Sequence, residues 1–281
     1  MKLLGIVILY YPQDDVVTNI NSYIGVLKEL FVWDNTPCGC GIDFPKNEKI
    51  KRMGVNENVG IGNALNEAVK YAKANHFTHI LTMDQDSYFI NEDFKKYIET
   101  ITQTNKKAIF VPNYLINGQA LFNNQNSLIE TEGSMTSGSV YPVDIFNEIG
   151  LFREDFFIDS IDDEFSFRSK KNGILTLAIP FVFLFHQAGY QKKKYKFLWK
   201  TFFPNEYSPI RSYYIIRNGL ISRKLYNKPT QEFLFYFFYK RIIFIICYES
   251  NKWQKIKGLI IGYMHGKMGK TGKQTIFKET S

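Results

Sequence analysis

Residues 58–87 read NVGIGNALNEAVKYAKANHFTHILTMDQDS, and this stretch decides the fold class. Its first half predicts a loop that leads into a helix, because apolar residues recur there at helical spacing on one face: Ala64, Leu65, Ala68, Val69 and Ala72. Its second half predicts a buried strand over His79–Met83 that stops at Asp84. A helix followed at once by a short apolar strand is typical of an α/β fold.

The residues before this stretch repeat the same alternation. Leu3–Leu9, Leu30–Trp33 and, more weakly, Ile50–Val55 are predicted strands, and residues 15–29 carry the spacing of a helix. Strands separated by helices of this length form right-handed β-α-β units, which build a mainly parallel sheet. The sequence therefore predicts an α/β fold with such a sheet.

Three polar clusters follow predicted strands directly: Tyr10-Tyr11, Asp34-Asn35 and Asp84-Gln85-Asp86. In an open parallel sheet, ligands bind outside the carboxyl ends of the strands. The clusters therefore indicate a ligand site at that edge. The alternative is that Asp and Asn end these strands only because they suit turns.

The charge of the chain changes after His186. Residues 1–186 hold 16 Lys and Arg against 23 Asp and Glu, a net charge of −7, whereas residues 187–281 hold 19 against 4, a net charge of +15. We therefore predict a sheet domain over residues 1–190 and a basic, helical region over residues 191–281 that faces something anionic. Because the chain lacks zinc-finger spacing and an RNP-like aromatic motif, anionic lipid is favoured over nucleic acid.

The basic region is also rich in aromatic residues, above all in Gln231–Tyr248. Lys240 and Arg241 in its middle argue against a membrane-spanning helix, and no stretch of the chain approaches the roughly 18 consecutive apolar residues that such a helix needs. The segment is expected either to lie in the membrane interface, with its cations at the headgroups, or to pack on the sheet domain. Lys192-Lys193-Lys194 would add attraction to anionic headgroups.

Two further features indicate a cytosolic compartment. The apolar run Leu3–Tyr11 is too short for a signal peptide and is followed by Pro12 with no small-residue cleavage site, so a buried strand is expected there. Cysteines are few and odd in number, which is typical of reduced thiols: Cys38, Cys40 and Cys247.

Carboxylates and one imidazole are candidate metal ligands. Asp84 and Asp86 leave a strand two residues apart and offer the hard oxygen ligands that Mg²⁺ and Mn²⁺ prefer. His186 ends the apolar run Ile179–Phe185 and can complete a metal site with Asp86. By itself, however, a lone His after a strand is more often a packing residue, and an isolated D-x-D occurs by chance in many loops.

A second acidic cluster, Asp159-Ser160-Ile161-Asp162-Asp163-Glu164, holds four carboxylates in six residues. Because Phe165–Arg168 continues as a predicted helix, these acids lie in its first turn. The helix dipole there favours an ionised carboxylate, as a general base requires. An acid-rich helix start with no catalytic role is the alternative.

Taken together and in this order, these clusters resemble the inverting family 2 glycosyltransferases, and especially their bacterial rhamnosyltransferase-like branch. The resemblance covers about residues 3–220 and rests on nine segments: Ile8–Pro12, Trp33–Thr36, Glu57–Asn66, Met83–Ser87, Thr136–Gly138, Gly150–Phe152, Phe157–Arg168, His186–Gly189 and Arg211–Asn218. Tyr11 and Phe165 depart from the family, which often has Asn and Trp there. Neither departure removes a catalytic group.

The resemblance implies a GT-A fold, which is a Rossmann-like α/β domain, and it assigns roles to matching positions. Asp86 and His186 would hold Mg²⁺ or Mn²⁺, and Asp162 would take the proton from the acceptor hydroxyl, with Glu164 as the second candidate. A larger group would bind the nucleotide sugar: Tyr10, Asp34, Asn58, Gly60, Asn66, Asp84, Gly138, Arg211, Arg217 and Asn218. Among these, Asp34 would contact the pyrimidine base, and the last three would contact diphosphate or acceptor.

The reaction implied is an inverting transfer of L-rhamnose from dTDP-rhamnose to a lipid-linked glycan. It would serve bacterial surface polysaccharide synthesis, with the enzyme held peripherally at the cytoplasmic face of the plasma membrane. Two alternatives stay open: transfer of galactofuranose or another hexose by the same motifs, and a catalytically silent membrane-bound assembly factor that retains the fold. A nucleotidyltransferase is disfavoured, because no Gly- and Arg-rich loop follows the first strand.

Overall fold

The computed structural model describes residues 1–90, 92–186, 195–197, 200–202 and 206–277. Two compact units make up the chain: Met1–Arg153 with Phe165–Gln187, and Glu154–Glu164 with Ala188–Ser281. The acidic segment Glu154–Glu164 thus belongs to the second unit. The predicted division at residue 190 had placed this segment in the sheet domain. Gln187–Gly189 and Lys192–Lys194, named above for their motifs, lie outside the described residues.

The first unit is built on a sheet that contains ten strands among the described residues. β1 (Leu3–Leu9) pairs in parallel with β2 (Glu29–Asp34) on one side and with β4 (His79–Asp84) on the other. β2 also pairs in parallel with β3 (Ile50–Gly54). The path of strands runs β3-β2-β1-β4-β9-β6-β10-β5.

A second parallel pair lies further along this path, where β6 (Ile109–Ile116) runs beside β10 (Thr176–His186). The antiparallel pairings are shorter and involve four small strands: β5 (Ser87–Phe89), β7 (Gln119–Ala120), β8 (Ile129–Thr131) and β9 (Ser139–Pro142). Most of the paired length is therefore parallel. The prediction of an α/β fold with a mainly parallel sheet is confirmed.

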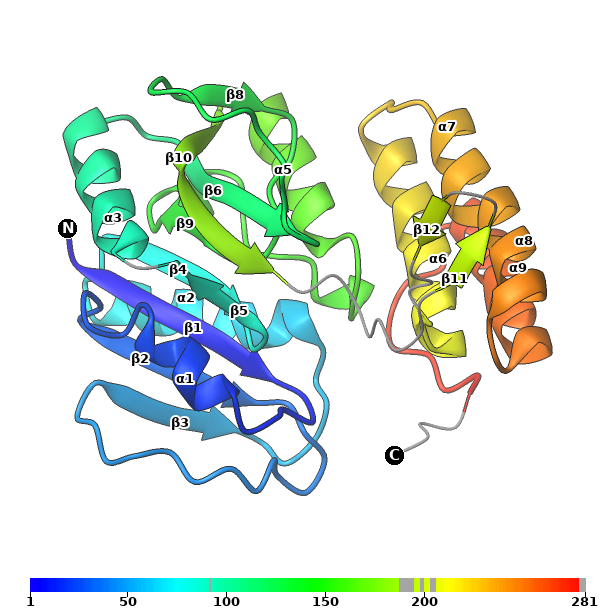
Figure 1. Cartoon of the computed structure of the whole chain (residues 1–281), viewed down its shortest axis with the longest axis horizontal. Helices are drawn as coiled ribbons and strands as arrows, with labels where there is room; N and C mark the ends of the chain where they lie inside the picture. Colours follow the sequence, from blue (N-terminus) through cyan, green and yellow to red (C-terminus); the bar gives the residue numbers. More distant parts are fainter. Residues whose placement is uncertain (91, 187–194, 198–199, 203–205, 278–281) are drawn as a thin grey trace. The chain divides into compact units, whose positions relative to one another are not determined.

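Helices cover both faces of this sheet (Figure 1). Side chains alternate between the faces of a strand, and Val7 of β1 packs in the same buried cluster as residues of α1 (Val16–Asn21) and α3 (Asp93–Thr104). The opposite face is covered by α2 (Ile61–Ala74), whose buried residues follow the predicted spacing. The short α4 (Ile145–Glu148) follows β9.

One predicted helix is much shorter than expected. Helical spacing over residues 15–29 predicted a single helix, but α1 ends at Asn21, and turns follow it. The hydroxyl of Ser22 donates to the carbonyl oxygen of Asn19 at 2.7 Å, a local bond of the kind that competes with helix continuation. The apolar residues beyond it still reach the core, because Tyr23 and Leu27 are buried.

The second unit is mostly helical in the part of the chain that the structure describes. Its main helices are α6 (Pro209–Leu225), α7 (Gln231–Leu234), α8 (Lys240–Tyr248) and α9 (Lys252–Met268). A π-helical segment, Phe235–Tyr239, joins α7 to α8, so the predicted helix over Gln231–Tyr248 is present with an altered centre. A small antiparallel pair, β11 (Tyr195–Phe197) and β12 (Lys200–Phe202), precedes α6.

α5 (Ile161–Lys171) carries the predicted acids in its first turn: Asp162, Asp163 and Glu164. A one-turn 3₁₀ helix, Glu154–Phe156, precedes it. Among the described helices, none combines the length and the apolar character that crossing a membrane requires.

Candidate active site at the carboxyl edge of the sheet

The three polar clusters that follow β1, β2 and β4 are tied together by hydrogen bonds. The backbone N–H of Tyr10 donates to Oε1 of Gln85 at 2.8 Å, and Nε2 of Gln85 donates back to the carbonyl of Tyr10 at 3.1 Å. The N–H of Tyr11 donates to Oγ1 of Thr36 at 3.1 Å. Because β2 and β4 flank β1 on opposite sides, this edge is a topological switch point, where open α/β sheets bind ligands.

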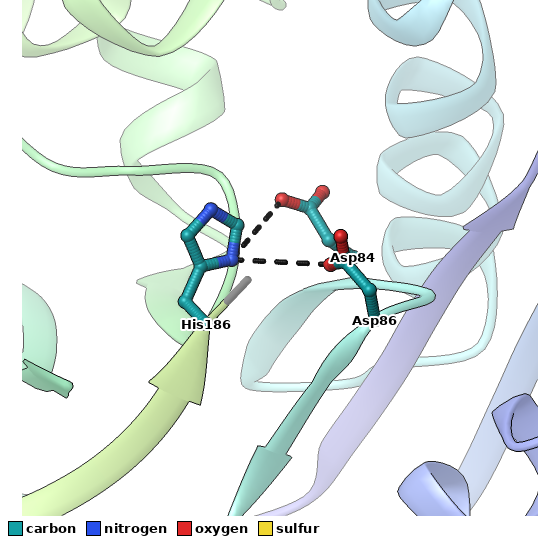
Figure 2. A group of neighbouring side chains, drawn as sticks. All are labelled: Asp84, Asp86 and His186. Atoms are coloured by element: carbon teal, nitrogen blue, oxygen red, sulfur yellow. Dashed lines mark ion pairs between the residues drawn. The ribbon is translucent and has the colours of Figure 1, made fainter. Parts of the chain in front are cut away.

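Asp84, Asp86 and His186 come together at this edge (Figure 2). Asp84 is the last residue of β4, Asp86 lies in the turn before β5, and His186 is the last residue of β10. β5 and β10 pair antiparallel with Ser87 opposite His186, so the register of one short strand places the imidazole beside the two carboxylates. Nδ1 of His186 lies 4.0 Å from Oδ2 of Asp84 and 3.9 Å from Oδ1 of Asp86.

These three side chains fit a divalent cation. Two ligands that each lie about 2.1 Å from one ion can be no more than about 4.2 Å apart. The separations of 3.9 and 4.0 Å between Nδ1 of His186 and the two carboxylates fall within that limit. Two carboxylates and one imidazole form a donor set that suits Mg²⁺ or Mn²⁺.

Ser87 influences how the imidazole of His186 can bind a cation. Its hydroxyl lies 2.8 Å from Nδ1 of His186 and 3.4 Å from Oδ1 of Asp86. The imidazole nitrogen can bind a cation only through its lone pair, so the Ser87 hydroxyl must then direct its proton elsewhere, and Asp86 is within reach. The sequence assigned no role to Ser87 or Gln85, although both lie within the segment Met83–Ser87 that carries the resemblance.

Asp86 has a perturbed ionisation. Burial and the neighbouring charge of Asp84 raise the pKa of Asp86 to about 6, and His186 opposes the rise. A carboxylate that resists ionisation beside another carboxylate is stabilised in its charged form when a cation binds. This electrostatic environment therefore agrees with the geometry of the three side chains.

Asp34 ends β2 and organises the loop that follows it. Its two carboxylate oxygens accept the backbone N–H groups of Thr36 at 3.0 Å and Cys40 at 2.8 Å. Burial alone would raise the pKa of Asp34, but these hydrogen bonds outweigh burial and hold the pKa below its usual value. Asp34 is therefore an ionised carboxylate at the sheet edge.

The loop before α2 lies next to Asp34. Nδ2 of Asn35 donates to Oδ1 of Asn58 at 3.0 Å, and the same oxygen accepts the N–H of Gly60 at 3.0 Å. Gly60 has φ 85°, a left-handed conformation that favours glycine, and it precedes the first residue of α2. The amino end of α2 therefore begins beside the polar edge.

Two residues that were predicted to bind the nucleotide sugar are buried and contact other parts of the protein. Asn66 is 1% exposed, and its amide exchanges two hydrogen bonds with the backbone of Phe152, at 3.0 and 2.9 Å. Gly138 is buried with φ 78°, and a Cβ there would meet side-chain atoms of Pro112 at 2.8 Å and of Leu184 at 2.9 Å. Packing thus explains both residues, and contact with a donor sugar stays a prediction.

The remaining predicted residues lie in the second unit. Asp162 is half-buried and its Oδ1 accepts the N–H of Asp163 at 3.0 Å. Glu164 is 2% exposed, and its Oε1 accepts the hydroxyl of Tyr226 at 2.6 Å, a partner that no sequence signal indicated. Burial raises the pKa of Asp163, although Arg223 and Ser160 oppose it.

Arg211, Arg217 and Asn218 lie on α6 and bind the acidic segment of their own unit. Nε of Arg211 pairs with Oδ1 of Asp159 at 3.2 Å, and the Arg211 side chain is 39% exposed. Arg217 and Asn218 are both 0% exposed, and both donate to backbone carbonyls of this segment. These contacts of Arg217 and Asn218 are therefore internal, and their predicted contact with a ligand stays a prediction.

Residues 43–203 match the protein family described as Glycosyl transferase family 2. The chain is also similar to a dTDP-rhamnosyl transferase of Shigella flexneri, RfbF, with 27% identity over 96% of this chain and 97% of that protein.

Two solved structures are similar in fold. The first, of GalNAc-T7 with UDP, GalNAc and Mn²⁺, has a TM-score of 0.57 and 11% identity; the match covers 86% of this chain and 50% of that one. The chain therefore spans about half the length of that protein. The second, of Staphylococcus aureus TarS 1–349 with UDP-GlcNAc, has a TM-score of 0.56 and 17% identity, and the match covers 92% of this chain and 80% of that one.

Proposed function

Because this chain belongs to glycosyl transferase family 2, we propose that it transfers L-rhamnose from dTDP-rhamnose to a lipid-linked saccharide and inverts the anomeric configuration. Glycosyl transfer follows from the family. The choice of rhamnose is supported by one observation above all: similarity to a dTDP-rhamnosyl transferase runs along nearly the whole of both chains.

In this proposal the nucleotide sugar binds at the carboxyl edge of the sheet. Asp34 contacts the pyrimidine base, with Tyr10 beside it, and the Asn58–Gly60 loop brings the amino end of α2 toward the negative donor. Asp84, Asp86 and His186 hold a divalent cation, which would neutralise charge on the departing diphosphate. The solved GalNAc-T7 contains UDP and Mn²⁺, which supports this assignment by analogy of fold.

Asp162 is assigned as the general base. Its carboxylate would take the proton from an acceptor hydroxyl, whose oxygen then forms a bond to the anomeric carbon of the donor sugar. The bond from that carbon to the diphosphate oxygen breaks on the opposite face, and the nucleoside diphosphate leaves with the bonding electrons. One such displacement inverts the configuration and needs no enzyme nucleophile.

Glu164 is the weaker candidate for this role. Its carboxylate is 2% exposed and accepts the Tyr226 hydroxyl, so a proton acceptor there would first have to release that partner. Asp162 is half-buried in the same helical turn. The difference in accessibility favours Asp162.

We also propose that the second unit attaches the enzyme to the cytoplasmic face of the bacterial plasma membrane. Large apolar side chains on the π-helical segment and α8 are exposed: Phe235 57%, Tyr236 50%, Tyr239 57%, Ile243 60% and Ile246 52%. Lys240 lies among them, 5.2 Å from the Tyr236 ring. Exposed apolar groups beside cations suit an anionic lipid surface, where a lipid-linked acceptor would be found.

A donor panel tests the proposal. The purified protein would be incubated with Mg²⁺ or Mn²⁺, a membrane extract that contains lipid-linked saccharides, and separately dTDP-rhamnose, UDP-galactofuranose and UDP-hexoses. We expect turnover of dTDP-rhamnose and release of dTDP. Turnover of the UDP sugars alone would reject rhamnose and favour the hexosyl or galactofuranosyl alternative.

Carboxylate variants separate an enzyme from a silent assembly factor. Asp162→Asn and Asp86→Ala should abolish most turnover and should fail to restore glycan synthesis in a deletion strain. Asp144→Asn is a matched control, because Asp144 is exposed and pairs with Lys107 in the first unit. Restoration of synthesis by all three variants would mean that the protein acts as a scaffold.

A further inference from the structure

The segment before α5 has an unusual backbone. Phe157, Asp159 and Ser160 have φ values of 66°, 63° and 59°, which lie in the left-handed region that non-glycine residues rarely adopt. Three such residues within four positions persist only where the surrounding structure determines their conformation. The groups that hold this segment therefore also influence the position of Asp162, which lies two residues after Ser160.

Asn218 of α6 holds the segment by its backbone. Its Nδ2 lies within hydrogen-bonding distance of three carbonyl oxygens, those of Phe156 at 2.9 Å, Ile158 at 2.8 Å and Asp159 at 3.0 Å. The two hydrogens of one amide are thus shared among three carbonyls between Phe156 and Asp159. Replacement of this amide would remove a donor from the part-buried carbonyls of Ile158 and Asp159, whereas the carbonyl of Phe156 would keep Arg217.

Arg217 fixes the amide and extends the same contact. Its Nε donates to Oδ1 of Asn218 at 2.7 Å, which orients the amide nitrogen toward the carbonyls. Its Nη2 donates to the carbonyls of Asp155 at 3.2 Å and Phe156 at 3.1 Å, and its Nη1 donates to that of Gly272 at 2.6 Å. The guanidinium therefore donates both to the segment that contains Asp155 and Phe156 and to the chain near Gly272.

Two other residues of the same face of α6 contact the segment. Arg211 pairs with Asp159 at 3.2 Å, and the ring of Tyr214 packs 5.4 Å from that of Phe157. Arg211, Tyr214 and Arg217 follow one another at three-residue spacing, and Asn218 lies four residues after Tyr214, so all four lie on one face of the helix. One face of α6 thus contacts the segment from Asp155 to Asp159.

We propose that Arg217 and Asn218 are positioning residues, which fix the backbone of Glu154–Glu164 so that Asp162 meets the acceptor hydroxyl in the geometry that proton transfer requires. This inference rests on the proposed function, in which Asp162 is the base. Both residues act through the loop and neither touches the donor. Displacement of a reacting group by about 1 Å can lower a rate by roughly 10²-fold, so a loosened loop should act mainly on kcat.

The test compares Asn218→Ala and Arg217→Met with Arg217→Lys and with a packing control. Leu259→Ala is that control, because Leu259 is 1% exposed on α9 and packs with Ile216 and Ile245 rather than with the acidic segment. Each variant would be assayed by steady-state kinetics with dTDP-rhamnose, by calorimetric titration of dTDP with Mn²⁺, and by hydrogen exchange followed by mass spectrometry.

We expect Asn218→Ala and Arg217→Met to lower kcat by roughly 10²-fold, with the dTDP dissociation constant unchanged. Arg217→Lys should recover part of the loss, because an ammonium can still donate to a carbonyl. The peptide that spans residues 154–164 should exchange faster in the first two variants and at the wild-type rate in Leu259→Ala.

Three outcomes count against these expectations, and they can be told apart. Weaker dTDP binding with unchanged kcat would overturn the positioning role and assign these residues to the donor. Equal kinetic losses in Asn218→Ala and Leu259→Ala, with no change in exchange of the 154–164 peptide, would also overturn it. A wild-type protein that turns over no nucleotide sugar would reject the proposed function itself.

Discussion

At the carboxyl end of β4, Asp86 lies beside Asp84, and burial together with that charge raises the pKa of Asp86 to about 6. Its folded-state pKa therefore exceeds the value of an exposed aspartate, about 3.9. Protonation stabilises the ion-free fold at low pH, and this contribution is lost as the pH rises through about 6. A bound cation, by contrast, favours the ionised form.

This ionisation predicts pH-dependent cation binding. We expect the Mn²⁺ affinity to fall by roughly tenfold as the pH is lowered from 7 to 5, because a proton competes for Asp86 over that range. Asp84→Asn should weaken binding and also move the pH midpoint downward, since one cause of the raised pKa is removed. Calorimetric titration with Mn²⁺ at several pH values measures both effects. An unchanged midpoint in Asp84→Asn would mean that another group titrates.

The pairing of α6 with α9 depends on glycines at every fourth position of α9. A Cβ at Gly258 would lie 2.4 Å from the carbonyl oxygen of Pro209, and one at Gly262 would lie 2.5 Å from that of Tyr213. At Gly266 the nearest atoms would be side-chain carbons of Leu220 at 3.0 Å. Because two of these contacts are with backbone, the helices cannot adjust by changing a rotamer.

Gly262→Ala should therefore destabilise the protein. In an exposed helix, a change from Gly to Ala would raise the free energy of unfolding by up to about 1 kcal/mol. Overpacking against a neighbouring backbone instead lowers the free energy of unfolding by about 1–3 kcal/mol. We expect a net loss of stability, measured by thermal or denaturant unfolding. Met264→Ala is the control: Met264 is 49% exposed on the same helix, and its loss should change stability by less than about 0.5 kcal/mol. A Gly262→Ala protein as stable as wild type would contradict this account of the helix pair.

For the whole molecule, the proposed attachment predicts salt-sensitive binding to anionic vesicles. The Debye length falls from about 10 Å at 0.1 M salt to about 3 Å at 1 M, so the contribution of the lysines and arginines should fall with it. A variant with Phe235, Tyr239 and Ile243 changed to Ser should sediment less with vesicles of anionic lipid. The matched control changes Val55 and Leu121, which are exposed by 54% and 56% in the first unit, to Ser. Equal sedimentation of both variants would reject attachment through the π-helical segment and α8.

Much of the fold could be predicted because its signals are local. The apolar run of β4 ends where Asp84 begins, and the buried face of α2 repeats at helical spacing, so each element is visible within about ten residues. The length of α1 was overestimated for a related reason. The spacing of apolar side chains continues to Leu27 and reports burial, but it does not reveal the Ser22 bond that accompanies the end of the helix.

The sequence alone determined the strand-and-helix alternation and the polar clusters at strand ends, because periodicity and turn chemistry depend on neighbours along the chain. Which distant residues meet depends on how the strands and helices pack. His186 reaches Asp84 and Asp86 through the register of β10 with β5. Arg217 binds carbonyls more than 60 positions earlier in the chain, a contact that the sequence did not indicate. Such contacts depend on strand order and helix packing, which minimise buried unpaired polar groups over the whole fold, and no local pattern encodes them.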